Sequence, residues 1–135
     1  MYIDSIELEN VRGFGRLSFS LDRGGNEYAG WTVFTGGNGS GKSTLLKAIA
    51  LVLTGTDAAR ALQPSFRGWL RAGATHASIQ AQVVRNDGED LFVEKGRLGD
   101  VRSPARLELH NGTREPSLEV VNPPGKSKNY RAPQR

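Results

Sequence analysis

Residues 35–46, TGGNGSGKSTLL, place four glycines within residues 36–41 and then pass directly into an apolar pattern with helical spacing. Glycine has no Cβ, so its backbone adopts positive φ and lets other groups approach closely. A helix that begins at this point presents unpaired N–H groups and the positive end of its dipole. The stretch therefore predicts a backbone nest for an anionic group at the start of a helix.

Residues 36–43 also satisfy the pattern G-x-x-x-x-G-K-[ST], in which a glycine-rich backbone surrounds nucleotide phosphates. The pattern lies between a predicted strand at 31–35 and a predicted helix at 42–54, which is the context that the motif requires. We therefore expect ATP with Mg²⁺ as the ligand. The alternative, a flexible linker before an ordinary helix, gives no reason for a Lys-Ser pair at the start of a buried helix.

The motif predicts a role for each polar residue that ends the loop. Lys42, the expected catalytic residue, should reach the β- and γ-phosphates, and Ser43 should place its hydroxyl on the Mg²⁺ ion. Thr44 should donate to the α-phosphate. The predicted nucleotide-binding residues of this loop are Gly36, Gly37, Asn38, Gly39, Ser40, Gly41, Lys42, Ser43 and Thr44.

The rest of the chain reads as strands with one further short helix. Alternating apolar residues predict strands at 2–11, 17–21 and 76–85, a return strand at 91–95, and a hairpin over 105–121 that turns at Asn111 and Gly112. Thr56 is the expected N-cap of a short helix over 57–62. In the helix at 42–54, the residues Leu46, Ile49, Ala50 and Leu53 recur at helical spacing, and the apolar content all round predicts burial on more than one side. Gln80 and Gln82 are assigned to the wet face of their strand.

Composition limits the classes of protein that this chain can represent. The sequence has no cysteine, and its two histidines, His76 and His110, are far apart, which argues against a zinc site. The sequence shows neither a secretory signal nor a long apolar run, so we expect a cytoplasmic protein without membrane contact. All 14 acidic residues and 14 of the 18 basic ones precede residue 122. We expect one neutral nucleotide-binding lobe at 1–121 and a basic, disordered tail at 122–135. The alternative role for the tail is a nonspecific contact with the phosphates of a nucleic acid.

The sequence also resembles a known family. The start IELENVRGFGRLSFSL, followed by GGNGSGKSTLLKAIALVLTG, is similar to the amino-terminal end of RecF/SMC-type ABC ATPases. These enzymes act in DNA repair and chromosome organisation, and related ATPases of the OLD group act in phage defence. The shared starting element here comprises Ile6, Leu8, Asn10, Val11, Arg12 and Phe14.

The resemblance implies a fold, partners and one further site residue. The fold is the P-loop α/β class, here as a first lobe with a mixed sheet and antiparallel hairpins. The family dimerises head to head, as homodimers or heteromers, and acts on DNA, so the resemblance implies both kinds of partner. It also implies that Arg12 lies near the nucleotide, although a solvent-facing arginine in a turn is an equal alternative.

The same family needs two motifs that the chain lacks. An apolar strand that ends in Asp-Glu and a Ser-Gly-Gly signature are both absent from the sequence, and the resemblance covers roughly residues 1–110. We therefore expect an amino-terminal fragment that is inactive alone, within a complete protein that hydrolyses ATP. Two alternatives are a non-catalytic or regulatory nucleotide-binding fragment and an ABC transporter ATPase subunit.

Overall fold

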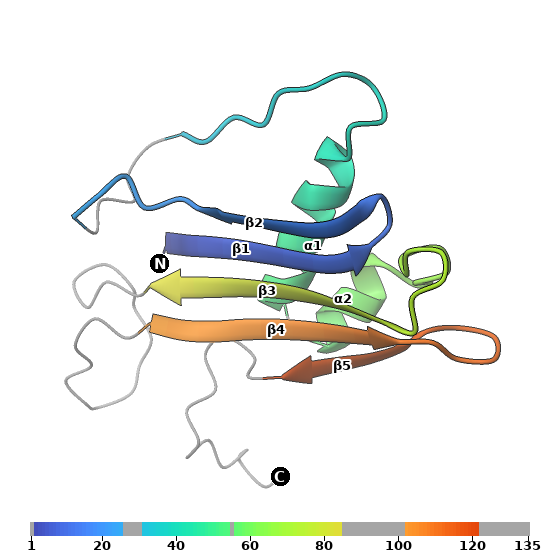
Figure 1. Cartoon of the computed structure of the whole chain (residues 1–135). Coiled ribbons are helices and arrows are strands. Elements are labelled where there is room, and N and C mark those ends of the chain that lie inside the picture. The colour runs from blue at the N-terminus through green and yellow to red at the C-terminus, as the bar shows by residue number, and fades with distance from the viewer. Residues whose placement is uncertain (1, 26–30, 55, 85–101, 122–135) are drawn as a thin grey trace, which may run out of the picture.

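The computed structural model describes residues 2–25, 31–54, 56–84 and 102–121. Its strands and helices follow in the order β1 (Tyr2–Val11), β2 (Phe14–Ser20), α1 (Lys42–Thr54), α2 (Thr56–Leu62), β3 (His76–Val84), β4 (Arg102–His110) and β5 (Ser117–Val121) (Figure 1). The expected helix at 42–54 is confirmed with the same bounds. The short second helix is also present, and it begins at Thr56 itself rather than after it.

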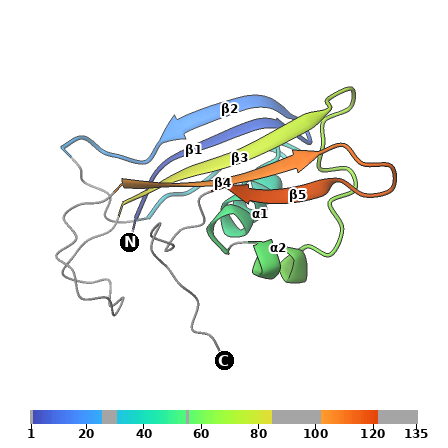
Figure 2. The same ribbon diagram turned by 90° about the horizontal axis from the view of Figure 1, so that it is seen from below.

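The strands form one sheet in the order β2-β1-β3-β4-β5. Each neighbouring pair is antiparallel, so the described residues supply no parallel part of the expected mixed sheet. Both helices lie on one face of this sheet, as the two perpendicular views show (Figures 1 and 2). The predicted α/β fold class is confirmed, and the opposite face of the sheet has no helix over it among the described residues.

The core forms between the sheet and α1 because the strands alternate apolar and polar residues. Ile6, Ile79 and Leu107 point to the helix-covered face and are 0% exposed. Leu45 and Leu51 of α1 pack against this face as part of the same apolar cluster. Burying a side chain of this size contributes about 1.5–3 kcal/mol to the free energy of folding. The apolar interface between α1 and the sheet is therefore the main source of the stability of the fold.

Of the four residues that showed the helical spacing of α1, Ile49 and Leu53 are partly buried and pack against the core, whereas Leu46 and Ala50 are exposed. The helix buries Leu45, Ala48, Leu51 and Val52 together with Thr44. Leu46, by contrast, is 55% exposed. The helix is apolar on more than one side, and the described residues cover only one of these sides. The sequence pattern alone does not show which apolar stripe of such a helix meets the sheet.

The strand predicted at 31–35 is wrong, because residues 31–37 form neither helix nor strand. Trp31 is 92% exposed and Val33 is 76% exposed. Phe34 does meet the sheet, with its ring centroid 5.6 Å from that of Phe19 in β2. β-branched and aromatic residues favour a strand only where a neighbouring strand accepts its backbone hydrogen bonds, and no described strand pairs with this segment.

The remaining sequence predictions divide into confirmed and undescribed parts. The hairpin over 105–121 is confirmed as β4 and β5, whose register pairs His110 with Ser117 next to the turn. Gln80 lies on the polar face of β3 and is half-buried, as predicted. The return strand at 91–95 and the tail at 122–135 lie outside the described residues. Among the described residues, no helix combines the length and the apolar character that crossing a membrane requires.

Candidate functional site

The glycine-rich loop lies at the amino-terminal end of α1, as the motif requires. Its residues precede Lys42, where the helix begins, and they are exposed from Gly36 to Ser40. The first helical hydrogen bond runs from the N–H of Leu45 to the carbonyl oxygen of Gly41 at 2.9 Å. The sequence therefore places a flexible, open backbone against the positive end of a 13-residue helix.

Lys42 folds back into this loop. Its Nζ donates hydrogen bonds to the carbonyl oxygens of Gly36 at 2.6 Å and Gly37 at 2.7 Å, and it lies 3.4 Å from Ser40 Oγ. The loop thus curls around one ammonium group. A phosphate that enters the loop can exchange these carbonyl contacts for hydrogen bonds in which the acceptor oxygen is charged as well as the donor.

Two glycines of the loop adopt backbone conformations that other residues avoid. Gly39 has φ 79° and Gly41 has φ 95°. A Cβ added at Gly41 would lie 2.5 Å from the Phe14 ring, and one added at Gly36 would lie 2.7 Å from Ser40 Oγ. A side chain at either position would therefore collide with the loop or with β2, which explains the glycines physically.

We expect Gly41→Ala to weaken the binding of magnesium-ATP at least tenfold. The substitution forces a strained φ and a collision with Phe14, and strain of this kind costs on the order of 1–3 kcal/mol, where 1.4 kcal/mol corresponds to a factor of ten. Equilibrium titration with a fluorescent ATP analogue measures the effect. Gly13→Ala is the control, because a Cβ there meets nothing within 4 Å; equal affinities for the two variants would contradict the prediction.

The two residues after Lys42 differ in accessibility. Ser43 is exposed in the first turn of α1, so its hydroxyl is available to a ligand at the loop. Thr44 is 9% exposed and faces the core side of the helix. The predicted contacts of Ser43 with Mg²⁺ and of Thr44 with the α-phosphate stay predictions.

Arg12 lies in the tight turn between β1 and β2, and its neighbourhood was missed by sequence reasoning. Asn10 has φ 53° and Arg12 has φ 49°, both in the left-handed region. The N–H of Arg12 donates to the carbonyl of Trp69 at 2.8 Å, and the N–H of Arg71 donates to that of Asn10 at 2.8 Å. The Arg12 guanidinium carbon lies 4.9 Å from the centroid of the Trp69 ring, which is a cation–π contact.

This turn is connected to the glycine-rich loop through Phe14, the first residue of β2. Its ring closes on Gly41 at a distance that excludes any side chain there. Arg71 holds the other side of the turn by donating from Nη1 to the carbonyl of Gly13 at 2.8 Å. The structure therefore brings the turn of Arg12 beside the loop, while its predicted contact with the nucleotide stays a prediction. The apolar residues Phe66, Trp69 and Leu70 in the segment at 65–74 were the available sign of this packing.

Glu115 anchors the segment that carries Trp69. Its Oε1 accepts hydrogen bonds from Ser65 Oγ at 2.8 Å, from the N–H of Phe66 at 2.5 Å and from the N–H of Arg67 at 3.1 Å. The hydrogen bond from Ser65 is the main reason that the pKa of Glu115 lies below its ordinary value, and the two N–H groups and the charge of Arg67 act in the same direction against desolvation. One carboxylate thus joins the turn between β4 and β5 to the segment before Trp69.

We expect Glu115→Gln to lower stability near neutral pH and to lose this effect in acid. The folded pKa is lowered, so the carboxylate stabilises the fold above the ordinary value of 4.5 and loses its contribution as pH falls through the folded pKa. Urea unfolding of both proteins between pH 7 and pH 3 tests this, with the exposed Glu7→Gln of β1 as control. Parallel curves for wild type and Glu115→Gln at all pH values would refute the assignment.

Comparison with known proteins adds a family and a fold to this geometry. The sequence matches the family described as "AAA domain" over residues 5–120. The fold is similar to a solved structure from work on "ATP-driven dimerization and DNA stimulated activation of SMC ATPases", with a TM-score of 0.59 and 21% identity over 91% of this chain and 71% of that chain. The family match shows an AAA domain, and the structural match confirms the SMC-type fold that the sequence resemblance predicted. The chain belongs to the AAA domain family and has the fold of an SMC ATPase.

Proposed function

We propose that the chain binds ATP with Mg²⁺ as part of an ATPase that acts in DNA repair, chromosome maintenance or phage defence. The observation that carries the proposal is the loop closed around the Lys42 ammonium at the start of α1. The fit to a nucleotide rests on the same geometry: the Phe14 ring leaves no room for a Cβ at Gly41, and the exposed Ser43 follows the lysine. When bound, magnesium-ATP supplies the phosphoryl group that the complete enzyme would transfer to water.

The residues described here account for binding and positioning. Lys42 compensates phosphate charge, the glycine backbone surrounds the phosphates, and Phe14 limits the space behind Gly41. Hydrolysis needs in addition an oriented water and charge stabilisation on the other side of the γ-phosphate. An Asp-Glu pair after an apolar strand and a Ser-Gly-Gly signature would supply these, and the sequence contains neither. We infer that a further segment or a second head completes the site.

The exposed apolar surface supports this inference. Trp31, Val33 and Leu46 are large apolar residues that stand 92%, 76% and 55% exposed. Large apolar side chains that stand exposed are candidates for a surface on which another part of a protein packs. We propose that another part of the ATPase domain packs on these residues.

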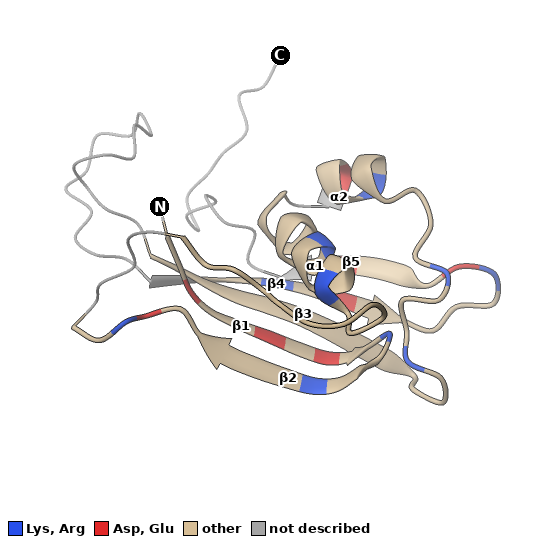
Figure 3. Cartoon of the chain, turned by 90° about the horizontal axis from the view of Figure 1, so that it is seen from above, with Lys and Arg blue, Asp and Glu red and all other residues tan. Residues whose placement is uncertain are grey.

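The proposed DNA partner rests on the family resemblance. Lys and Arg positions alternate with Asp and Glu positions over the described elements (Figure 3). A second candidate, a nucleotide-binding fragment without turnover, is favoured by the absence of the Asp-Glu pair. ATP hydrolysis by the complete protein that rises when DNA is added would support the first candidate. A complete protein that binds ATP without turning it over would support the second.

The decisive experiment for this chain is equilibrium binding of a fluorescent ATP analogue with and without Mg²⁺. We expect saturable binding that strengthens with Mg²⁺ and is displaced by unlabelled ATP. A folded chain, verified by far-ultraviolet circular dichroism, that shows no saturable binding would overturn the proposed function.

A further inference from the structure

The uncovered face of the sheet gathers both histidines of the chain and two glutamates. His76 of β3 and His110 of β4 are 34 positions apart in the sequence, yet they are register partners on neighbouring strands. Glu108 of β4, two residues before His110, is the register partner of Glu119 in β5. Side chains two residues apart on a strand share a face, so all four groups lie on the face opposite the helices. The sequence-based argument against a zinc site rested on the distance between the two histidines along the chain. It fails, because the strand register places them next to each other.

Three of these side chains are already close together. One potential ligand atom from each of Glu108, His110 and Glu119 lies within 4.8 Å of the other two. His110 Nε2 is 3.4 Å from Glu108 Oε2, and the side chains of these two residues are 45% and 24% exposed. Ligands at about 2.0–2.2 Å from a tetrahedral zinc ion lie roughly 3.3–3.6 Å apart. A small rotation of the side chains would bring the three ligand atoms from their present spacing, within 4.8 Å, to the spacing around a zinc ion.

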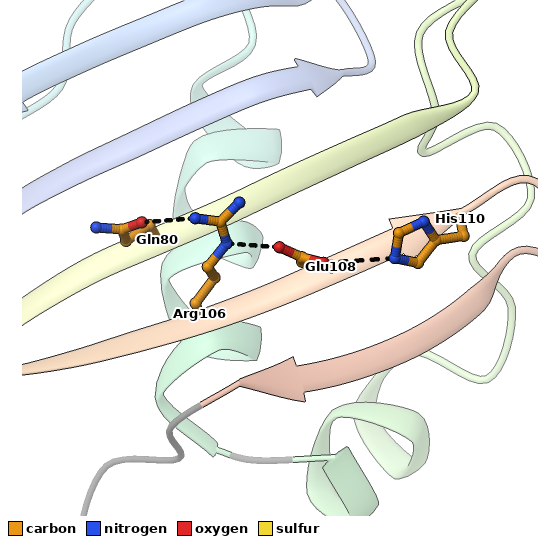
Figure 4. Close-up of polar contacts among 4 residues, drawn as sticks. All are labelled: Gln80, Arg106, Glu108 and His110. Carbon is orange, nitrogen blue, oxygen red and sulfur yellow. Dashed lines mark hydrogen bonds and ion pairs between the residues drawn. The ribbon is translucent and has the colours of Figure 1, made fainter.

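Arg106 holds Glu108 in the orientation that such a site needs. Its Nε lies 2.7 Å from Glu108 Oε1, and its Nη1 donates to Gln80 Oε1 at 3.4 Å. The contact occupies one carboxylate oxygen and leaves the other facing His110 (Figure 4). Neighbouring groups that fix a ligating carboxylate in this way are typical of metal sites.

The charges of the cluster favour a cation. Glu108 and Glu119 stand directly opposite each other on adjacent strands, a placement in which two like charges destabilise a sheet. Arg106 contacts Glu108 and offsets one of the two negative charges, which leaves the pair with one excess negative charge. A divalent ion between the strands would offset the remaining repulsion and tie the edge strand β5 to β4.

We propose that Glu108, His110 and Glu119, with His76 as the fourth ligand, form a site for a zinc-class divalent cation. Imidazole nitrogen combined with carboxylate oxygen suits Zn²⁺ and its neighbours, whereas Mg²⁺ and Ca²⁺ prefer oxygen ligands alone. The site is separate from the glycine-rich loop and does not depend on nucleotide binding. It would stabilise the sheet edge formed by β3, β4 and β5.

The composition of the chain allows zinc binding at this site to be measured without competition from other imidazole or thiolate ligands. Because the sequence has no cysteine and only two histidines, both in this cluster, imidazole or thiolate ligands elsewhere cannot imitate the site. Zinc is titrated into the folded chain without nucleotide, in competition with a chromophoric chelator. We expect one ion per chain, and at least tenfold weaker binding for Glu119→Gln and for His110→Ala. Glu7→Gln, on the same face of β1, is the matched carboxylate control and should bind as the wild type does.

A second measurement guards against variants that lose their fold. In the nitrogen-15 spectrum of the wild-type chain, zinc should shift the imidazole signals of both histidines, whereas magnesium should shift neither. Circular dichroism verifies the fold of each variant. Zinc binding of equal strength in wild type and Glu119→Gln, or imidazole signals that zinc leaves unchanged, would overturn the proposal.

Discussion

Lys42→Ala should weaken the affinity of the chain for magnesium-ATP by about 10- to 100-fold. The ammonium is the charged group around which the loop closes, with carbonyl contacts at 2.6 and 2.7 Å. A hydrogen bond to a charged group contributes about 1.5–3 kcal/mol, and 1.4 kcal/mol is a factor of ten in Kd. In the complete protein the same substitution should abolish ATP hydrolysis.

Lys47→Ala is the matched control for this experiment. Lys47 is an exposed lysine of the same helix, one turn and a half further on, so its removal changes the net charge equally. A titration of both variants with a fluorescent ATP analogue separates a contact at the loop from a general charge effect. If both variants lose affinity equally, or if Lys42→Ala binds as the wild type does, the role of Lys42 is wrong.

Trp69→Ala should lower the free energy of unfolding by about 3–5 kcal/mol, the range found when a large aromatic side chain is removed from a core. Trp69 is 0% exposed and packs edge-to-face on Phe66, with ring centroids 5.7 Å apart. Its ring also carries the cation–π contact with Arg12. Removing the indole leaves a cavity beside the turn between β1 and β2. Because that turn abuts the nucleotide loop through Phe14, affinity for ATP should fall as well.

The chain contains its own control for this substitution. Trp31, the other tryptophan, is 92% exposed, so Trp31→Ala should change stability by less than about 0.5 kcal/mol. Trp69→Phe should cost less than Trp69→Ala, because it keeps the ring packing and removes an indole N–H that is buried without a hydrogen-bond partner among the described residues. Urea unfolding followed by circular dichroism measures all three variants. Equal midpoints for Trp69→Ala and Trp31→Ala would contradict the assigned packing.

Sequence reasoning found the part of the site that is formed by residues adjacent in the chain. The loop at 36–43 and the helix that follows depend on the backbone freedom of glycine and on the unpaired N–H groups of a helix start, and neither property requires a distant residue. The motif therefore placed Lys42 and Ser43 correctly at the start of α1. The hairpin of β4 and β5 was predictable for the same reason, because alternation and the Asn111-Gly112 turn are short-range signals.

The strand expected at 31–35 shows that short-range sequence signals do not predict whether a strand finds a pairing partner. Its residues have strand propensity, but a strand is stable only when a neighbour accepts its backbone hydrogen bonds, and no described strand does so. A related limit applies to α1, for which the sequence predicted burial on more than one side. A helix that is apolar on several sides does not encode which side meets the sheet.

The sequence by itself determined the glycine-rich loop and the helix behind it, because both rest on the stereochemistry of consecutive residues. Only the tertiary structure decided that Glu115 anchors the segment before Trp69, that Phe14 closes on Gly41, and that both histidines stand side by side with two glutamates. These contacts join residues tens of positions apart. Strand register and core packing set such contacts, and both depend on the whole chain, so no short stretch of sequence carries them.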